Sequence, residues 1–154
     1  MKALILGMIA SLFLLTTAEG HAYDVQKERY DLWIEACLHT QYSCQGVKPP
    51  KVRKVHTRTG LYGYYDGGGT IFISNKLTAE KRRATIYHEM VHYLQAKVGG
   101  LPIPGPASLI CEAEAEAFAE TDERWVRIGL PHRQRGADWW KPYRHCRQFY
   151  ESRS

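Results

Sequence analysis

The 154-residue sequence lacks a long hydrophobic run and lacks closely spaced cysteines. Its uncharged apolar run, Ala3–Leu15, is shorter than the roughly 20 residues that a membrane-spanning helix requires. The absence of any Cys-x-x-Cys pair excludes the usual zinc site built from thiolates. No cysteine follows the apolar run closely, so we expect no lipid anchor at that position.

The N-terminus instead has the organisation of a secretory signal peptide. One basic residue, Lys2, precedes the apolar run, and small residues follow the run as far as Ala22. Gly20 and Ala22 satisfy the small-x-small rule for cleavage after Ala22, and Ala18 offers an alternative position. We therefore expect a signal peptide over residues 1–22 and a secreted or periplasmic mature protein.

The remaining chain, residues 23–154, is long enough for one domain with a modest core and too short for two. The formal net charge is +5, and cleavage leaves it unchanged because Lys2 and Glu19 are removed together. Basic residues such as 81–83 are typical of a solvated helix face. We therefore expect neither a nucleic-acid partner nor stable membrane insertion after cleavage.

The four cysteines are an even number, which in an exported chain indicates two disulfides. Three pairings are possible, and we favour Cys37–Cys44 together with Cys111–Cys146. A helix that ran through both Cys37 and Cys44 would hold them about 10 Å apart, too far for a bridge. The pairing therefore predicts that the first helix, which we expect from Asp24 to about His39, breaks near Thr40.

The pattern His-Glu-x-x-His occurs at His88, Glu89 and His92. We expect it on a helix that begins after Thr78, a favourable N-cap, and ends near Val98, where two glycines follow. His88 and His92 then stand one turn apart on one face, so both imidazoles can bind the same metal ion. The helical period is carried by Ala84, Tyr87, Val91, Leu94 and Val98.

Glu89 lies between the two histidines and need not bind the ion itself. Its carboxylate can take a proton from a water molecule that zinc has acidified to a pKa of about 7. A chance match to a five-residue pattern is the alternative, and the helical context argues against it. The motif thus predicts a zinc-dependent hydrolase with Glu89 as its general base.

A catalytic zinc needs three protein ligands and one open position, so the second helix, expected from Ser108 to Ile128, must supply the third. Glu114 lies on the apolar stripe of this helix, where a carboxylate needs a partner or a metal. The other carboxylates lie toward the opposite side, where Arg124 and Arg127 can pair with them. These other carboxylates are Glu112, Glu116, Glu120 and Glu123.

The expected positions of the residues along the two helix axes also favour Glu114 as the third ligand. His92 lies about 10 Å before the end of the first helix at Gly99, and Glu114 lies about 9 Å after the start of the second. If the two helices pack antiparallel, His92 and Glu114 therefore lie at the same level along the helix axes. Glu112 would lie about 3 Å lower and face outward.

These helices resemble those of the gluzincins, metallopeptidases whose zinc is bound by His-Glu-x-x-His and by a glutamate on a following helix. The chain is most similar to small bacterial families with His-Glu-x-x-His-x-x-Gln followed by Cys-x-x-Glu-x-x-Ala-aromatic. Here the second pattern falls on Cys111, Glu114, Ala117 and Phe118. The resemblance covers residues 60–128 and implies a minimal zincin-like fold.

Two features of the resemblance leave alternatives open. A looser similarity to the ImmA/IrrE-type peptidases, over residues 112–119, would make Glu112 the zinc ligand. Thermolysin-like gluzincins place an aspartate four residues after the ligand glutamate to orient a histidine, and here that position is Phe118. Asp122 or a backbone carbonyl would then take this role. The lone histidines His132 and His145 are candidates for stabilising an oxyanion.

We expect the strands of the sheet between the first helix and the His-Glu-x-x-His helix in sequence. Residues 52–74 contain β-prone runs and a glycine turn after Asp66, which predict two or three antiparallel strands. We expect the last of them, residues 70–74, to form the edge along which an extended substrate lies. The fold class is therefore α+β, a small antiparallel sheet packed on a helical layer with the His-Glu-x-x-His helix and an antiparallel ligand helix.

The sequence as a whole predicts a zinc metallopeptidase of gluzincin type that cleaves a peptide or protein substrate in the cell envelope or outside the cell. The metal ligands would be His88, His92 and Glu114, with one zinc ion per chain. The alternative is a non-catalytic, zinc-stabilised module that binds an envelope component or a protein. Glu89 favours catalysis, because a purely structural zinc does not need it and has a closed shell of four ligands.

Overall fold

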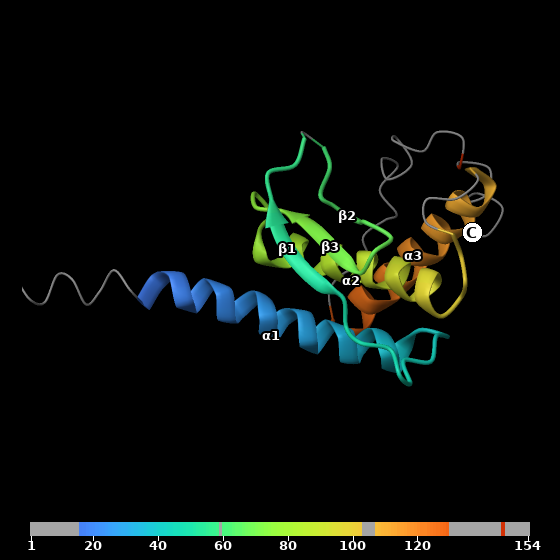
Figure 1. Cartoon of the computed structure of the whole chain (residues 1–154), viewed down its shortest axis with the longest axis horizontal. Helices are drawn as coiled ribbons and strands as arrows, with labels where there is room; N and C mark the ends of the chain where they lie inside the picture. The colour runs from blue at the N-terminus through green and yellow to red at the C-terminus, as the bar shows by residue number, and fades with distance from the viewer. Residues whose placement is uncertain (1–15, 59, 103–106, 130–145, 147–154) are drawn as a thin grey trace, which may run out of the picture.

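The computed structural model describes residues 16–58, 60–102, 107–129 and 146. Their fold is α+β, as predicted, with three helices and one three-stranded sheet among these residues (Figure 1). In chain order the elements are α1 Thr16–His39, β1 Lys51–Val55, β2 Gly63–Tyr65, β3 Thr70–Ser74, α2 Ala79–Lys97 and α3 Ala107–Arg127.

The first helix is longer than predicted. It begins at Thr16, so Asp24 lies inside it instead of capping it, and the helix passes through the expected cleavage position after Ala22. Its first turns project beyond the rest of the molecule (Figure 1). Its C-terminal half carries the buried core residues Leu32 and Trp33. The signal peptide itself stays a prediction.

The sheet is mixed, which corrects the prediction of an antiparallel one. Its strand order is β1-β3-β2, with β1 parallel to β3 and β2 antiparallel to β3. The chain turns back after β1, passes to the far side of the sheet and forms the β2–β3 hairpin, so β3 lies between the two earlier strands. The prediction that residues 70–74 form an edge is therefore wrong: β3 is the central strand, and β1 and β2 are the two edge strands of this sheet.

The boundaries of α2 and α3 agree closely with those predicted. Thr78 is the N-cap of α2 and accepts a hydrogen bond from the backbone N–H of Lys81, at 3.4 Å. Val98 is the C-cap, and Gly100 follows with a φ of 67° that favours glycine. Since these signals lie next to the helix in sequence, local chemistry decides where it begins and ends.

The core is assembled around α2, which contacts α1, α3, β2 and β3. Its apolar stripe is buried as predicted at Tyr87, Val91 and Leu94, whereas Val98 at the C-terminal end is exposed. Ile71 and Ile73 of β3 are completely buried and belong to the same hydrophobic cluster. The His-Glu-x-x-His motif is therefore carried by the most enclosed helix of the described structure.

Two ion pairs fasten α1 to the other helices. Arg82 of α2 donates two hydrogen bonds to the buried carboxylate of Glu28, at 2.6 and 2.8 Å. Arg124 of α3 has its Nε 3.0 Å from Glu35 Oε1. Arg82 is thus not part of a solvated face, because α1 packs against α2. Arg124 was predicted to pair with a glutamate of α3, but its ion-pair partner is Glu35 of α1.

Both predicted disulfides are present, and all four cysteines are paired. Cys37 and Cys44 have their Cα atoms 5.6 Å apart because α1 ends at His39, as the pairing requires. Cys111, in the second turn of α3, bonds to Cys146.

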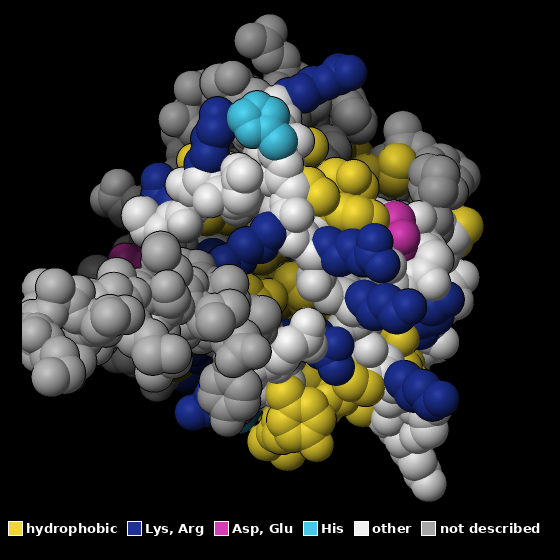
Figure 2. Space-filling view, turned by 60° about the vertical axis from the view of Figure 1, so that its left-hand side comes forward, with side chains coloured by type: hydrophobic (Ala, Val, Ile, Leu, Met, Phe, Trp, Pro, Cys, Tyr) yellow, Lys and Arg dark blue, Asp and Glu magenta, His cyan; other side chains and the backbone are white. Residues whose placement is uncertain are grey.

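Among the described residues, no helix combines the length and the hydrophobicity needed to cross a bilayer. One face of the molecule carries many Lys and Arg side chains and few acidic ones (Figure 2). This distribution is consistent with the net charge of +5.

Candidate metal centre

Three predicted ligand residues meet where α2 packs against α3. His88 Nε2 lies 3.2 Å from Glu114 Oε2 and 3.2 Å from His92 Nε2, and His92 Nε2 lies 3.4 Å from Glu114 Oε2. Each residue thus offers one ligand atom to a common triangle, and together they form a group that can hold a metal ion. His92 and Glu114 are buried and His88 is half-buried.

The triangle has the dimensions that a tetrahedral zinc site requires. Nitrogen and oxygen ligands lie about 2.0–2.1 Å from zinc, so two ligand atoms of one tetrahedron are separated by about 3.3 Å. The three observed separations, between 3.2 and 3.4 Å, match this value. Two imidazoles and one carboxylate also form a ligand set that zinc commonly takes in catalytic sites. The residues present therefore fit a zinc ion.

The structure distinguishes between the two glutamates that the sequence left as alternatives. Glu114 is only 8% exposed and faces both histidines, whereas Glu112 is exposed. Glu116, predicted to pair with an arginine, instead faces Gln95 on α2 and the loop after α1. The placement of Glu114 follows from the antiparallel packing of α2 and α3 that the height argument assumed.

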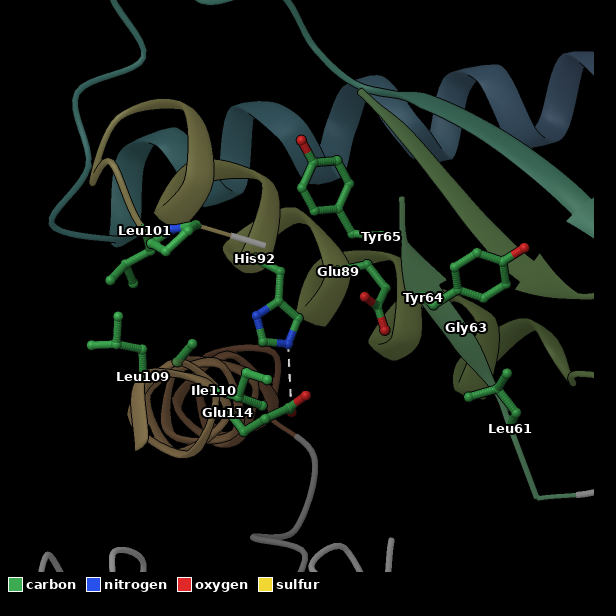
Figure 3. A pocket seen from close by; sticks show the side chains of 12 residues that line it. Leu61, Gly63, Tyr64, Tyr65, Glu89, His92, Leu101, Leu109, Ile110 and Glu114 are labelled. Carbon is green, nitrogen blue, oxygen red and sulfur yellow. Dashed lines mark ion pairs between the residues drawn. The ribbon is translucent and has the colours of Figure 1, made fainter. Parts of the chain in front are cut away.

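Glu89 lies beside the triangle and is not one of the three ligand groups. Its side chain is 7% exposed, and the backbone N–H of Tyr65 on β2 donates a hydrogen bond to its carboxylate. Glu89, His92 and Glu114 line one cavity of about 250 Å³. Figure 3 shows the Glu89 carboxylate and the Glu114 side chain directed into the same space, from α2 and α3 respectively.

The free edge of β2 faces this cavity. The hairpin pairs Tyr64 with Phe72, and the flanking bonds run from Asp66 N–H to Thr70 and from Ser74 N–H to the carbonyl of Tyr62. Paired residues alternate along an antiparallel ladder, so the backbone groups of Gly63 and Tyr65 point away from β3. Gly63 and Tyr65 are also lining residues of the cavity.

A close approach between β2 and α2 explains why position 63 is a glycine. A Cβ atom added to Gly63 would lie 2.6 Å from the Thr85 Cγ2 atom of α2 and 2.9 Å from the backbone oxygen of Phe72. Neither distance is compatible with a side chain. Gly63 therefore allows β2 to pack directly on α2, next to Glu89.

The opposite wall of the cavity is apolar. It is formed by Leu101, Leu109 and Ile110, while Leu61 and Tyr64 lie on the side of the sheet (Figure 3). Because apolar walls surround a few polar groups, the cavity has the character of a ligand site.

Burial and neighbouring charges together set the pKa values of three side chains of the site. Burial raises the pKa of Glu89, although His88 and His92 oppose this effect. Burial would also raise the pKa of Glu114, but hydrogen bonds with His88 and His92 outweigh it and lower the pKa of that carboxyl. For His92, burial favours the neutral ring, but Glu114 raises its pKa to about 9. Glu114 thus stays a carboxylate, the form that binds metal, while Glu89 gains basicity.

A residue that received no role from the sequence, Gln95, holds one of the histidines. His92 Nδ1 lies 2.8 Å from Gln95 Oε1, so the partner is neither Asp122 nor a backbone carbonyl. The spacing of three residues on one helix, already present in the His-x-x-Gln pattern, is the signal that could have identified the pair.

His88 is held differently. Its ring packs against Phe118, with ring centroids 4.4 Å apart, so the position that is an aspartate in thermolysin-like enzymes supplies packing instead of a hydrogen bond. Its Nδ1 is buried without a hydrogen-bond partner among the described residues. The two other predicted histidines, His132 and His145, lie outside the described residues.

Comparisons with protein-family models, with curated proteins and with solved structures found no match for this chain. The resemblance to gluzincins therefore stays an expectation that is based on the sequence motifs.

Proposed function

We propose that this chain is a zinc-dependent peptidase of the gluzincin type, with a minimal zincin-like fold. The observation that carries the proposal is the placement of Glu89 beside a triangle of ligand atoms whose separations fit tetrahedral zinc. A structural zinc would need a fourth protein ligand in place of the cavity that Glu89, His92 and Glu114 line.

The chemistry is divided between the metal and one carboxylate. When bound by His88, His92 and Glu114, zinc supplies a Lewis acid that polarises the scissile carbonyl and lowers the pKa of water. Glu89 takes the proton from the attacking water and then passes it to the nitrogen of the leaving amine. The raised pKa of the buried Glu89 suits this role, because a base that must also act as an acid works best near the ambient pH.

The edge strand supports a peptide as the substrate. The backbone groups of Gly63 and the carbonyl of Tyr65, which point away from β3, can form hydrogen bonds with an extended chain laid along β2. Such a chain would pass over Glu89 and face the apolar wall that contains Leu101 and Leu109. The proposed substrate is therefore an extended peptide segment with an apolar side chain next to the cleaved bond.

We place this activity outside the cytoplasm, in the periplasm or in the extracellular space. The supporting observation is the pair of disulfides, Cys37–Cys44 and Cys111–Cys146, because such bonds persist in oxidising compartments.

Two measurements on the exported, purified protein test the proposal. Metal analysis by mass spectrometry should find about one zinc per chain. Incubation with an unfolded protein, followed by mass spectrometry of the fragments, should reveal new peptide termini. Glu89→Gln should keep the zinc and lower the cleavage rate by roughly 100- to 10,000-fold, the usual contribution of a general base.

The possible outcomes separate catalysis from the alternative of a binding module. Zinc-loaded protein that cleaves no peptide, or Glu89→Gln that cleaves at the wild-type rate, would overturn the peptidase proposal. Protein without zinc would overturn the metal site as well.

A further inference from the structure

Gln95 is a polar side chain that is completely buried within α2, next to the metal centre. Each polar atom of its amide has a partner: Oε1 lies 2.8 Å from His92 Nδ1, and Nε2 donates to the Ala113 carbonyl at 2.9 Å and to Glu116 Oε2 at 2.8 Å. An amide buried in an apolar core is costly, so these contacts indicate a specific role.

The partners of Gln95 decide which way its amide points. The Ala113 carbonyl and the Glu116 carboxylate are both acceptors, and only the NH₂ group of the amide can donate to them. Its oxygen must therefore face His92, and because this oxygen only accepts, His92 Nδ1 must carry a proton.

The position of that proton matters for metal binding. A neutral imidazole with its proton on Nδ1 has an unprotonated Nε2, and Nε2 is the atom that lies 3.2 Å from His88 Nε2 and 3.4 Å from Glu114 Oε2. Gln95 thus selects the form of His92 that can bind a metal at the triangle. It also fixes the rotation of the ring.

Glu116 connects Gln95 to a second part of the fold. Besides Gln95, its carboxylate accepts hydrogen bonds from the Tyr42 hydroxyl at 2.9 Å and from Gln41 Nε2 at 2.6 Å. Burial and the nearby Glu116 raise the pKa of Tyr42 to about 12, so its hydroxyl remains a donor.

The loop that carries these donors is itself fixed in place. The Cys37–Cys44 disulfide closes the loop against the end of α1. The Tyr42 ring lies against Gly99 at the end of α2, where an added Cβ atom would approach Tyr42 Cε1 to 3.1 Å.

We propose that Gln95 is a positioning residue for the zinc ligand His92, and that Tyr42 and Glu116 hold Gln95 in its metal-supporting orientation. This inference rests on the proposed zinc site, but it assigns residues from outside the triangle to the control of metal affinity. The contacts link three segments: Tyr42 of the disulfide-closed loop contacts Glu116 of α3, and Glu116 contacts Gln95 of α2.

The first test replaces the amide by an apolar side chain of similar length. Gln95→Met should weaken zinc binding about 10- to 100-fold, the usual effect of losing the group that orients a ligand histidine. Zinc affinity is measured by competition with a chromogenic chelator at fixed pH. The matched control is Gln45→Met, at an exposed position of the chain just after the loop, which should retain wild-type affinity. Wild-type zinc affinity in Gln95→Met would overturn the inference.

The second test addresses the connection to the loop. Tyr42→Phe, which removes only the hydroxyl, should weaken zinc binding less than Gln95→Met does, and should cause no further loss in the Gln95→Met background. Fully additive losses would show that Tyr42 acts independently of Gln95 and would overturn this part of the inference. Tyr30→Phe, at an exposed position of α1, serves as the control.

A third measurement does not depend on any variant. Nitrogen NMR of ¹⁵N-histidine-labelled, metal-free protein, at a pH where His92 is neutral, should show its proton on Nδ1. A proton on Nε2 would overturn the inference even if Gln95→Met failed to fold. Wild-type protein that binds no zinc would instead overturn the proposed function, so the two failures are distinguishable.

Discussion

At the scale of single residues, the site depends on which carboxylate of α3 completes the triangle. Glu114→Ala should lose most of the bound zinc, because only His88 and His92 would remain as ligands. The zinc content of the purified variant, measured by mass spectrometry, checks this prediction.

The matched control for Glu114 lies two residues earlier on the same helix. Glu112→Ala removes an exposed carboxylate, so zinc should stay nearly intact and stability should change by no more than about 0.5 kcal/mol. Zinc lost in Glu112→Ala and retained in Glu114→Ala would contradict the geometry and favour the alignment with ImmA/IrrE-type peptidases.

The grouping of His88, His92 and Glu114 could be predicted from the sequence because each inference used the regular geometry of helices. Residues four apart on a helix share a face, and this placed His88 and His92 together. The apolar stripe and the height along an antiparallel pair then selected Glu114. The contact between His92 and Gln95 has a local signal in their spacing of three residues. The contacts of Gln95 with Ala113 and Glu116 could not be predicted, because both partners lie on α3 and their approach depends on tertiary packing.

At the scale of secondary-structure elements, the contact between β2 and α2 is the most sensitive to substitution. Gly63→Ala should lower the free energy of unfolding by about 1–3 kcal/mol, because the new Cβ atom would clash with Thr85 and with the Phe72 carbonyl. Cleavage activity should fall too, since the displaced strand carries the Tyr65 N–H that contacts Glu89. Urea denaturation and a peptide-cleavage assay measure the two effects.

The hairpin turn provides the control for this substitution. A Cβ atom added to Gly68 would meet only the Asp66 side chain, at 3.5 Å or more, so Gly68→Ala should be tolerated much better. Equal losses of stability in the two variants would show that the close contact with α2 is not the cause.

The helices were predicted more accurately than the sheet, for a physical reason. The ends of α2 are fixed by Thr78 and by the glycines that follow Val98, which are sequence neighbours of the helix. The order of the strands is fixed by the pairing of β1 with β3, which are separated in sequence by β2. Strand periodicity identifies the strands but does not specify which of them become neighbours.

At the scale of the whole molecule, the proposed zinc ion should contribute to stability. Its ligands come from α2 and α3, so an ion bound to all three is released when the two helices separate. At free zinc about 100-fold above the Kd, the native state should gain about 2.7 kcal/mol. Thermal unfolding with zinc and with an excess of chelator measures this gain, which should disappear in Glu114→Ala. An unchanged Tm in the wild-type protein would contradict the prediction.

The projecting start of α1 contains the predicted cleavage position, after Ala22. Cleavage after Ala22 would cut inside this helix and leave the N–H groups of a new first turn without carbonyl partners. Asp24 would then stand in that first turn, where the helix dipole favours acidic residues. A residue from the interior of the longer helix would thus become a residue of the first turn in the shortened one.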